Sequence, residues 1–190
     1  GAEVNQKDST GETPLMLALS SNRLDVARVL VIAGADLEEN DANEMTPLQR
    51  FAQQSWHVDA LRFLLEAGAN TMVRDSEGLI PLDYACTSGS SEMVKALLEA
   101  GSPVNSICSH CEETPLFQAA FHGHIDVVRI LISYEADVNK RNSHGMTPIV
   151  DAVTHYTWQT KETKLKKLEV AAILRAAGAD EPLYRLRHDQ

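Results

Sequence analysis

Apolar residues in this chain gather in short clusters separated by polar turns, and the clusters are of two alternating kinds. The first kind, such as residues 15–19, follows a Thr-Pro pair. It predicts a short helix, because Thr is a good N-cap and Pro suits the first helical position. The second kind is denser, as over residues 24–30 and 125–131. Its apolar residues fall on more than one side of a helix, which predicts a helix packed between neighbours.

A residue triplet marks each first helix and recurs at a nearly constant interval. The steps between its five copies are 33, 34, 34 and 33 residues. The copies are Thr13-Pro14-Leu15, Thr46-Pro47-Leu48, Ile80-Pro81-Leu82, Thr114-Pro115-Leu116 and Thr147-Pro148-Ile149. A period of this kind predicts a solenoid, in which a helix pair buries its apolar face only against its neighbours.

A small-residue motif ends each unit, about 21 residues after the triplet in the first four copies and 31 residues after it in the fifth. The motifs are Gly34-Ala35-Asp36, Gly68-Ala69-Asn70, Gly101-Ser102, Glu135-Ala136-Asp137 and Gly178-Ala179-Asp180. Glycine there ends the second helix in the left-handed conformation. Glu135 replaces glycine, and a side chain with a Cβ loses about 1–2 kcal/mol in that conformation, so Glu135→Gly is predicted to stabilise the protein.

With these landmarks the chain resembles the ankyrin repeat family, and the segment 113–132 is a near-consensus copy of its repeat. The resemblance implies an all-α repeat solenoid, an ankyrin-like stack of helix-turn-helix units with protruding β-hairpin loops. The expected domain covers residues 1–181, with a C-terminal tail at 182–190. Its repeats are expected at about 4–36, 37–70, 71–103, 104–137 and 138–180.

The chain departs from the family pattern in two respects. The histidine that the family places after Thr-Pro-Leu is absent from every repeat, so its usual hydrogen bonds are not carried over to this chain. The residues at that position are Met16, Gln49, Asp83, Phe117 and Val150. Repeat two also has one extra residue near 49–56, and repeat five has about ten near 156–166.

Composition narrows the classes of partner. The 190 residues are 44% hydrophobic, which fits one elongated domain, and no apolar run reaches the roughly 18 residues of a transmembrane helix. A signal peptide is not recognisable. The net charge of −10 disfavours nucleic acid and anionic membranes, because phosphate binding needs a basic surface. The acidic turns either keep a long solenoid soluble or form an acidic groove for a basic partner. Asp8, Asp41 and Asp75 are expected in these turns, with carboxylates that bind nearby backbone N–H groups.

The resemblance also implies where partners bind, namely at the hairpin tips and the exposed sides of the first helices. The residue before each Thr-Pro pair or its equivalent lies at such a tip. These residues are Glu12, Met45, Leu79, Glu113 and Met146. Apolar side chains at three of these five tips predict contact with another protein.

Aromatic residues and histidines extend the predicted contact surface. The first-helix ends contribute Phe121, His122 and His155, and both tryptophans, Trp56 and Trp158, lie at the two insertions. Trp is a favoured interface anchor. The alternative is that each Trp fills the gap made by its insertion.

The cysteines leave three interpretations open. Cys86 falls at a small-residue core position, which predicts a buried, unreactive thiol. Cys108 and Cys111 lie in the fourth hairpin tip. They are free thiols, or a disulfide that implies an oxidising compartment, or part of a zinc site completed by His110 or His144.

No catalytic motif is present, neither a Gly-rich phosphate loop nor His-Glu-x-x-His nor a nucleophile elbow. The sequence therefore predicts a non-catalytic protein-binding module without cofactor or metal. We expect a monomer that inhibits or regulates one partner protein, such as an enzyme with a basic patch, through a concave face. One alternative is a segment of a longer scaffold, in which Leu15, Met16, Leu17 and Leu19 would be exposed. Residues 1–5 match a repeat-closing loop, so either a preceding repeat was removed or the chain begins there.

The other alternative is a redox- or metal-responsive binder that uses the Cys108/Cys111 loop. The compartment differs between the two states of this loop. A soluble cytoplasmic protein is expected if the thiols are free. A periplasmic or secreted protein is expected if a signal peptide was removed and the pair is oxidised.

Overall fold

The computed structural model describes residues 3–154 and 160–180. Within these ranges it forms helices and turns and no β-strand. The chain divides into two compact units, residues 1–103 and 104–190. Two of the predicted contact residues, His155 and Trp158, and the predicted tail lie outside the described residues.

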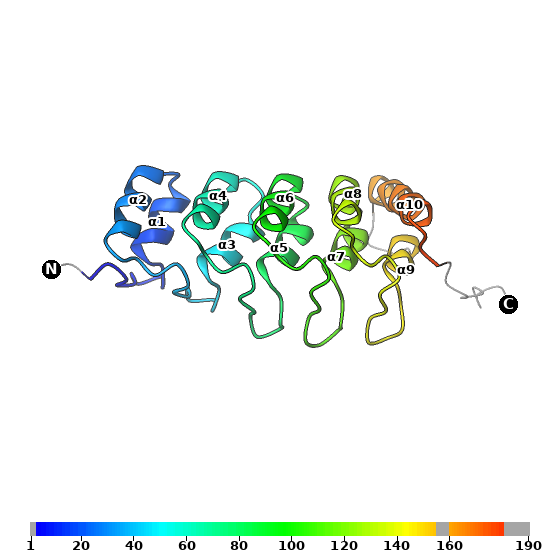
Figure 1. Cartoon of the computed structure of the whole chain (residues 1–190), viewed down its shortest axis with the longest axis horizontal. Coiled ribbons are helices and arrows are strands. Elements are labelled where there is room, and N and C mark those ends of the chain that lie inside the picture. Colours follow the sequence, from blue (N-terminus) through cyan, green and yellow to red (C-terminus); the bar gives the residue numbers. More distant parts are fainter. Residues whose placement is uncertain (1–2, 155–159, 181–190) are drawn as a thin grey trace. The chain divides into compact units, whose positions relative to one another are not determined.

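The first unit contains three pairs of helices. α1 (Pro14–Ser20) precedes α2 (Leu24–Ile32), α3 (Pro47–Gln53) precedes α4 (Val58–Glu66), and α5 (Pro81–Ser88) precedes α6 (Ser91–Glu99). α3 packs against α5 and α4 against α6, so the first helices form one row and the second helices another (Figure 1). This is the helix-turn-helix stack that the period predicts.

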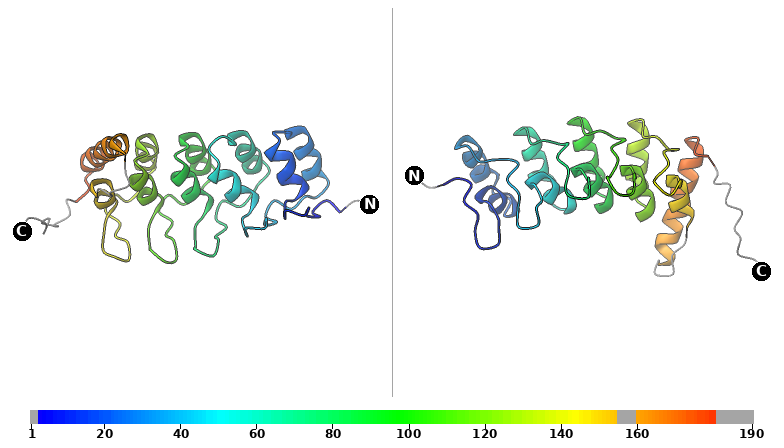
Figure 2. Two further views of the ribbon diagram at one scale, coloured as in Figure 1. Left: turned by 180° about the vertical axis from the view of Figure 1, so that it is seen from behind. Right: turned by 90° about the horizontal axis from the view of Figure 1, so that it is seen from below.

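The second unit contains two pairs, and its last helix is unusually long. α7 (Pro115–His122) precedes α8 (Ile125–Ser133), and α9 (Pro148–Val153) precedes α10 (Lys161–Ala176). α10 packs against α7, α8 and α9. It has 16 residues where α2, α4, α6 and α8 have nine each, and Figure 2 shows its greater length. The predicted insertion accounts for this, since part of it adds about two turns to the start of α10.

The predicted threonine caps form at two of the helices. Thr13 Oγ1 accepts a hydrogen bond from Met16 N (3.2 Å), and Thr46 Oγ1 accepts one from Gln49 N (3.3 Å). Each bond satisfies a backbone N–H that has no partner within the helix. Thr114 and Thr147 precede α7 and α9 without such a bond, so the prediction is wrong there.

The second helices end as the sequence predicts. Gly34, Gly68, Gly101 and Gly178 have φ between 88° and 92°, and Glu135 adopts φ 64° at the matching position. The structure adds three non-glycine residues with positive φ. Asn22 has φ 52° in the turn after α1, and Glu44 and Glu112 have φ 61° and 55° in their loops. Other loops have glycine at the corresponding position, namely Gly11, Gly78 and Gly145.

The core of each unit lies between its two rows of helices. The apolar residue of every triplet is fully buried there, as at Leu48 and Leu116. Complete burial of a Leu side chain contributes about 1.5–3 kcal/mol. Leu15, Met16 and Leu19 are also fully buried, and Leu17 alone of the four expected exposed residues has a large exposed surface. The expectation for these three is wrong because α1 turns them toward its own core.

The loops that precede the helix pairs project from one side of each unit (Figure 1). In the first loop Asp8 N donates to Glu12 O (3.0 Å), and in the second Asp41 N donates to Met45 O (2.9 Å). The loops are therefore hairpin-like, as the resemblance implies. A single closing bond of this kind is too little for a strand ladder, which explains why no strand occurs in the described residues.

Candidate functional site

One loop design recurs on the side where the hairpin-like loops lie. Asp41 Oδ1 accepts hydrogen bonds from Asn43 N (2.8 Å) and Met45 N (3.1 Å), and Asp8 and Asp75 do the same in their loops. This confirms the predicted turn role of the three aspartates. Burial alone would raise the pKa of Asp41. The bonds from Met45, Asn43 and Arg50 outweigh that effect and hold its pKa below the usual value.

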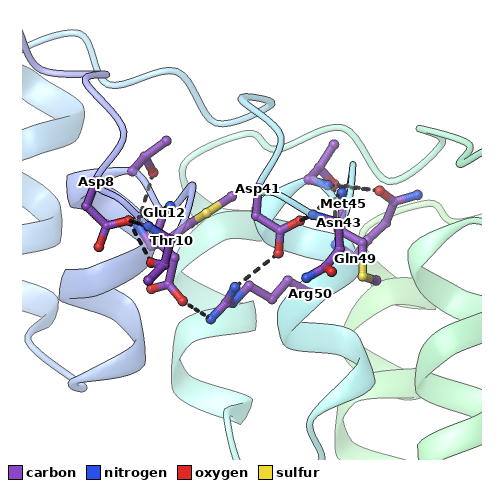
Figure 3. A network of polar contacts seen from close by, with 11 residues as sticks. Asp8, Thr10, Glu12, Asp41, Asn43, Met45, Gln49 and Arg50 are labelled. Carbon is purple, nitrogen blue, oxygen red and sulfur yellow. Dashed lines mark hydrogen bonds and ion pairs between the residues drawn. The ribbon is translucent and has the colours of Figure 1, made fainter.

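In two of these aspartates, Asp41 and Asp75, the second oxygen binds a side chain of the following first helix. Arg50 donates to Asp41 Oδ2 (3.0 Å), and the Tyr84 hydroxyl donates to Asp75 Oδ2. Arg50 also pairs with Glu12 of the preceding loop (Figure 3). Arg50 and its acidic partners are largely buried, so this network fixes the positions of two neighbouring loops relative to each other.

Gln49 takes over hydrogen bonding at a position where the family has histidine. Its Oε1 accepts from Thr46 N (3.0 Å), and its Nε2 donates to the carbonyls of Val73 and Leu79 (3.3 Å each). Asp83, one repeat later, accepts from Ile80 N (2.9 Å) through Oδ2. The side chains at these two positions thus brace the loops without histidine, which sequence reasoning missed.

The first unit presents apolar surface on this braced frame. Met45 and Leu79 are half-buried, less exposed than their tip positions suggest. Trp56 is 75% exposed in the turn between α3 and α4, next to the His57 ring at 5.9 Å. A side chain so exposed does not fill a gap, so the alternative interpretation of Trp56 is wrong.

Leu17 and Met72 are exposed apolar residues that were not predicted as contacts. Leu17 stands where the next two repeats have Arg50 and Tyr84, whose polar groups bind loop aspartates. An apolar residue in a row of hydrogen-bonding residues was a signal present in the sequence. Met72 follows the end of a repeat, and its sequence context carried no such signal.

The predicted contacts of the second unit are already engaged within the protein. Glu113 is half-buried and accepts from Gln118 Nε2 (3.4 Å) and Asn142 Nδ2 (3.1 Å). Met146, also half-buried, donates its N–H to Asn142 Oδ1 (3.0 Å). Both residues therefore stabilise loops, and their side chains offer a partner less surface than expected.

Phe121 and His122 are half-buried against α10. The Lys167 ammonium lies 5.2 Å from the Phe121 ring centre and donates to Thr154 O (3.1 Å). Burial, together with the charges of His124 and Lys167, lowers the pKa of His122. A Cβ on Gly123 would lie 3.3 Å from Lys166 Cβ, which shows how closely α10 covers this turn. The insertion thus removes much of the exposure expected at Phe121.

The fourth loop contains a disulfide between Cys108 and Cys111. Cys108 stands where other loops have Asp or Asn, and its sulfur accepts from Glu113 N (3.4 Å). The carbonyl of Cys111 accepts from Ser143 N of the next loop (2.9 Å). Cys86 is a buried free thiol, as predicted, and burial raises its pKa well above the usual value. In the described ranges, no three metal-binding side chains come together.

None of the helices in residues 3–154 and 160–180 combines the length and apolar character that a membrane span requires.

Comparison with known proteins agrees with this architecture. A family model for ankyrin repeats in three copies matches residues 31–108 and 100–180, and a single-repeat model matches residues 10–42. Inversin from Canis lupus familiaris is 29% identical over 152 residues, which are 80% of this chain and 14% of inversin. Human transient receptor potential cation channel subfamily A member 1 is 31% identical over 156 residues, covering 78% and 14% of the two chains.

A shorter relative gives the same result. Human ankyrin repeat and SOCS box protein 16 is 34% identical over 136 residues, which are 72% of this chain and 30% of the relative. The chain thus spans less than one third of each of these three relatives. The matched models cover most of its length and coincide with the helix pairs, so the chain belongs to the ankyrin repeat family.

Proposed function

We propose that this chain is a non-catalytic module that binds another protein and inhibits or regulates it. The observation that carries the proposal is apolar surface on a rigid frame in the first unit. Trp56 and Leu17 are exposed, with Met45 and Leu79 half-buried at neighbouring loops. Preordered loops lose little conformational entropy on binding, which favours affinity.

Charge supports a partner with a basic patch. Residues 1–150 contain 10 Lys and Arg against 21 Asp and Glu, whereas residues 151–190 contain 7 against 6. The exposed loop acid Asp8 keeps a lowered pKa because hydrogen bonds from the Thr10 side chain and from nearby backbone N–H groups favour its ionised form. Exposed acids of this kind attract cationic side chains and speed association.

The test compares two exposed apolar positions with a matched control. Trp56→Ser and Leu17→Ser together should abolish capture of a partner, because Trp anchors often contribute about 2 kcal/mol or more at interfaces. Ile32→Ser removes an exposed apolar side chain from a second helix and should leave capture intact. Activity of the captured protein with and without the chain then tests inhibition. If the wild type, the double variant and Ile32→Ser capture the partner equally, this surface is not the binding site.

A second candidate, a segment of a longer ankyrin scaffold, is favoured by one observation. Val26 and Val29 of α2 are 41% and 65% exposed, whereas Ala60 and Phe63, their counterparts in α4, are almost fully buried. A preceding helix pair covers these positions in repeat two. The relatives are much longer than this chain, which is consistent with further repeats.

The scaffold candidate has its own test. A copy of residues 71–103 placed before residue 4 should raise the melting temperature if it stacks on Val26 and Val29. Val26→Asp in the extended protein serves as the control and should cancel most of the gain, because it buries a charge at the new contact. An extension that leaves the melting temperature unchanged contradicts stacking at this face.

A further inference from the structure

We propose that the exposed side of α10 is a docking surface for an acidic amphipathic helix of a partner protein. This surface, here the α10 ridge, consists of Lys161, Leu165, Leu168 and Ala172. At about 100° per residue these four lie along one side of the helix. Leu165 and Leu168 are 60% and 48% exposed. The surface is separate from the loops of the proposed function and does not depend on them.

The α10 ridge is not the core-facing side of the helix, because the residues that pack into the core lie on the opposite side of α10. Val170, Ala171 and Leu174 are fully buried against the rest of the second unit, and Lys167 is buried with its ammonium bound to Thr154 O. The inner side of α10 is therefore fully packed against its own unit. Leu165 and Leu168, three residues apart, form a second apolar stripe on the outer side, and a partner helix binds to an apolar stripe of this kind.

The two edges of the ridge differ in charge. One edge carries Glu162 and Glu169, which pair with Lys166 (2.7 Å) and Arg129 (3.6 Å) of this same chain. These ion pairs neutralise that edge. The other edge carries Lys164, and Lys161 lies at the start of the ridge. These two lysines make this side of the ridge cationic, so acidic side chains on the incoming helix fit it best.

A further ankyrin repeat does not fit the ridge well. In α2, Arg28 lies 5.8 Å from the Phe63 ring of the next pair, and Val31 lines a groove with Phe63 and Ala67. All four of these second helices, α2, α4, α6 and α8, have a cation at the position of Arg28 and an apolar residue at the position of Val31. In α10 these positions hold Ala172 and Arg175, which reverses the pattern.

An anionic membrane fits less well than a protein helix. A helix lying on a bilayer carries cations along both edges of its apolar stripe, where they meet lipid headgroups. On the α10 ridge one edge lacks such a row of cations, because its Lys166 and Arg129 are paired with Glu162 and Glu169. A partner helix contacts a narrow stripe and places its acids only where the cations lie.

The experiment uses the full chain and two designed 18-residue helical peptides. Both carry leucines at the spacing of Leu165, Leu168 and Ala172, with Glu on both edges in one peptide and Lys on both edges in the other. Affinity is measured by fluorescence anisotropy at low and moderate salt. The chain as a whole has a net charge of −10, so only a local cationic surface favours the acidic peptide.

The acidic peptide should bind at least about tenfold more tightly than the basic one. Leu165→Ser with Leu168→Ser should weaken its binding by about tenfold or more, whereas Met72→Ser, at an equally exposed methionine of the other unit, should have no effect. Lys161→Glu with Lys164→Glu should reverse the preference between peptides. Circular dichroism confirms that each variant remains folded.

Three results overturn the proposal. The first is equal affinity for the two peptides, which would mean that charge at the ridge does not select the partner. The second is no binding of either peptide, the result expected if a further repeat or another segment of the chain covers the ridge. The third is binding to phosphatidylserine vesicles that is lost in the Leu165→Ser, Leu168→Ser variant, which would assign the ridge to a membrane surface.

Discussion

Asp83 is a buried carboxyl whose ionisation opposes folding, and Asp83→Asn should remove that opposition. The side chain is 3% exposed and accepts one hydrogen bond, from Ile80 N (2.9 Å). Burial raises the pKa of Asp83 from 3.8 to about 7, and the nearby Asp75 adds to this effect, against the Ile80 bond and the Arg74 charge. Asn keeps an oxygen acceptor for Ile80 N and has no charge to bury.

The magnitude follows from the pKa difference between the folded and unfolded chain. Between pH 3.8 and about 7 the folded state holds a proton that the unfolded state has released. The free energy of unfolding therefore falls as pH rises through this window, by about 1.4 kcal/mol for each pH unit. From pH 5 to pH 8 the loss due to Asp83 is about 2.5 kcal/mol. In the variant this contribution is zero.

Urea denaturation of both proteins at pH 5, 6, 7 and 8 tests the prediction. The Asn variant should gain stability relative to the wild type as pH rises, by about 2.5 kcal/mol over the whole range. Asp59→Asn, at an exposed position on α4, is the control and should follow the wild type. A constant difference between variant and wild type at every pH would refute the reasoning, because it would mean that Asp83 titrates alike in both states.

Three further predictions concern backbone strain and the cysteines. Glu135→Gly should raise the free energy of unfolding by about 1 kcal/mol, since φ is 64° there, and an unchanged urea midpoint would contradict this. Gly11→Ala should lower the free energy of unfolding by about 1–3 kcal/mol more than Gly145→Ala does. Both have φ above 70°, but only the first new Cβ would meet a neighbour, Ala42 Cβ at 2.7 Å, and equal losses would exclude a steric cause. Thiol counting on the untreated, denatured protein should find one reactive cysteine, Cys86, and three after reduction; three at the outset would show that the Cys108–Cys111 bond is absent in solution.

Local chemistry explains the features that were predicted from the sequence. The triplet spacing places a proline at the first position of each first helix, and the small-residue motif places a left-handed residue after each second helix. The Glu135 conformation and the aspartate turns follow from the same short-range rules. These features depend on residues within a few positions of one another, so the period and the residue types were sufficient to predict them.

Long-range packing decided the candidate site. The sequence treated Trp56 and Phe121 as similar anchors, but Trp56 is 75% exposed in its turn, whereas α10 covers much of Phe121. Gln49 links repeat two to the carbonyls of repeat three, a partnership between residues 24 and 30 positions apart.

The repeat, the helix pairs and their ends could thus be predicted from the amino-acid sequence, because they arise from contacts within one unit of about 33 residues. Which apolar side chains remain exposed became clear only from the packing of whole repeats. Exposure depends on what the neighbouring repeat places over a side chain, as the exposed Val29 and its buried counterpart Phe63 show.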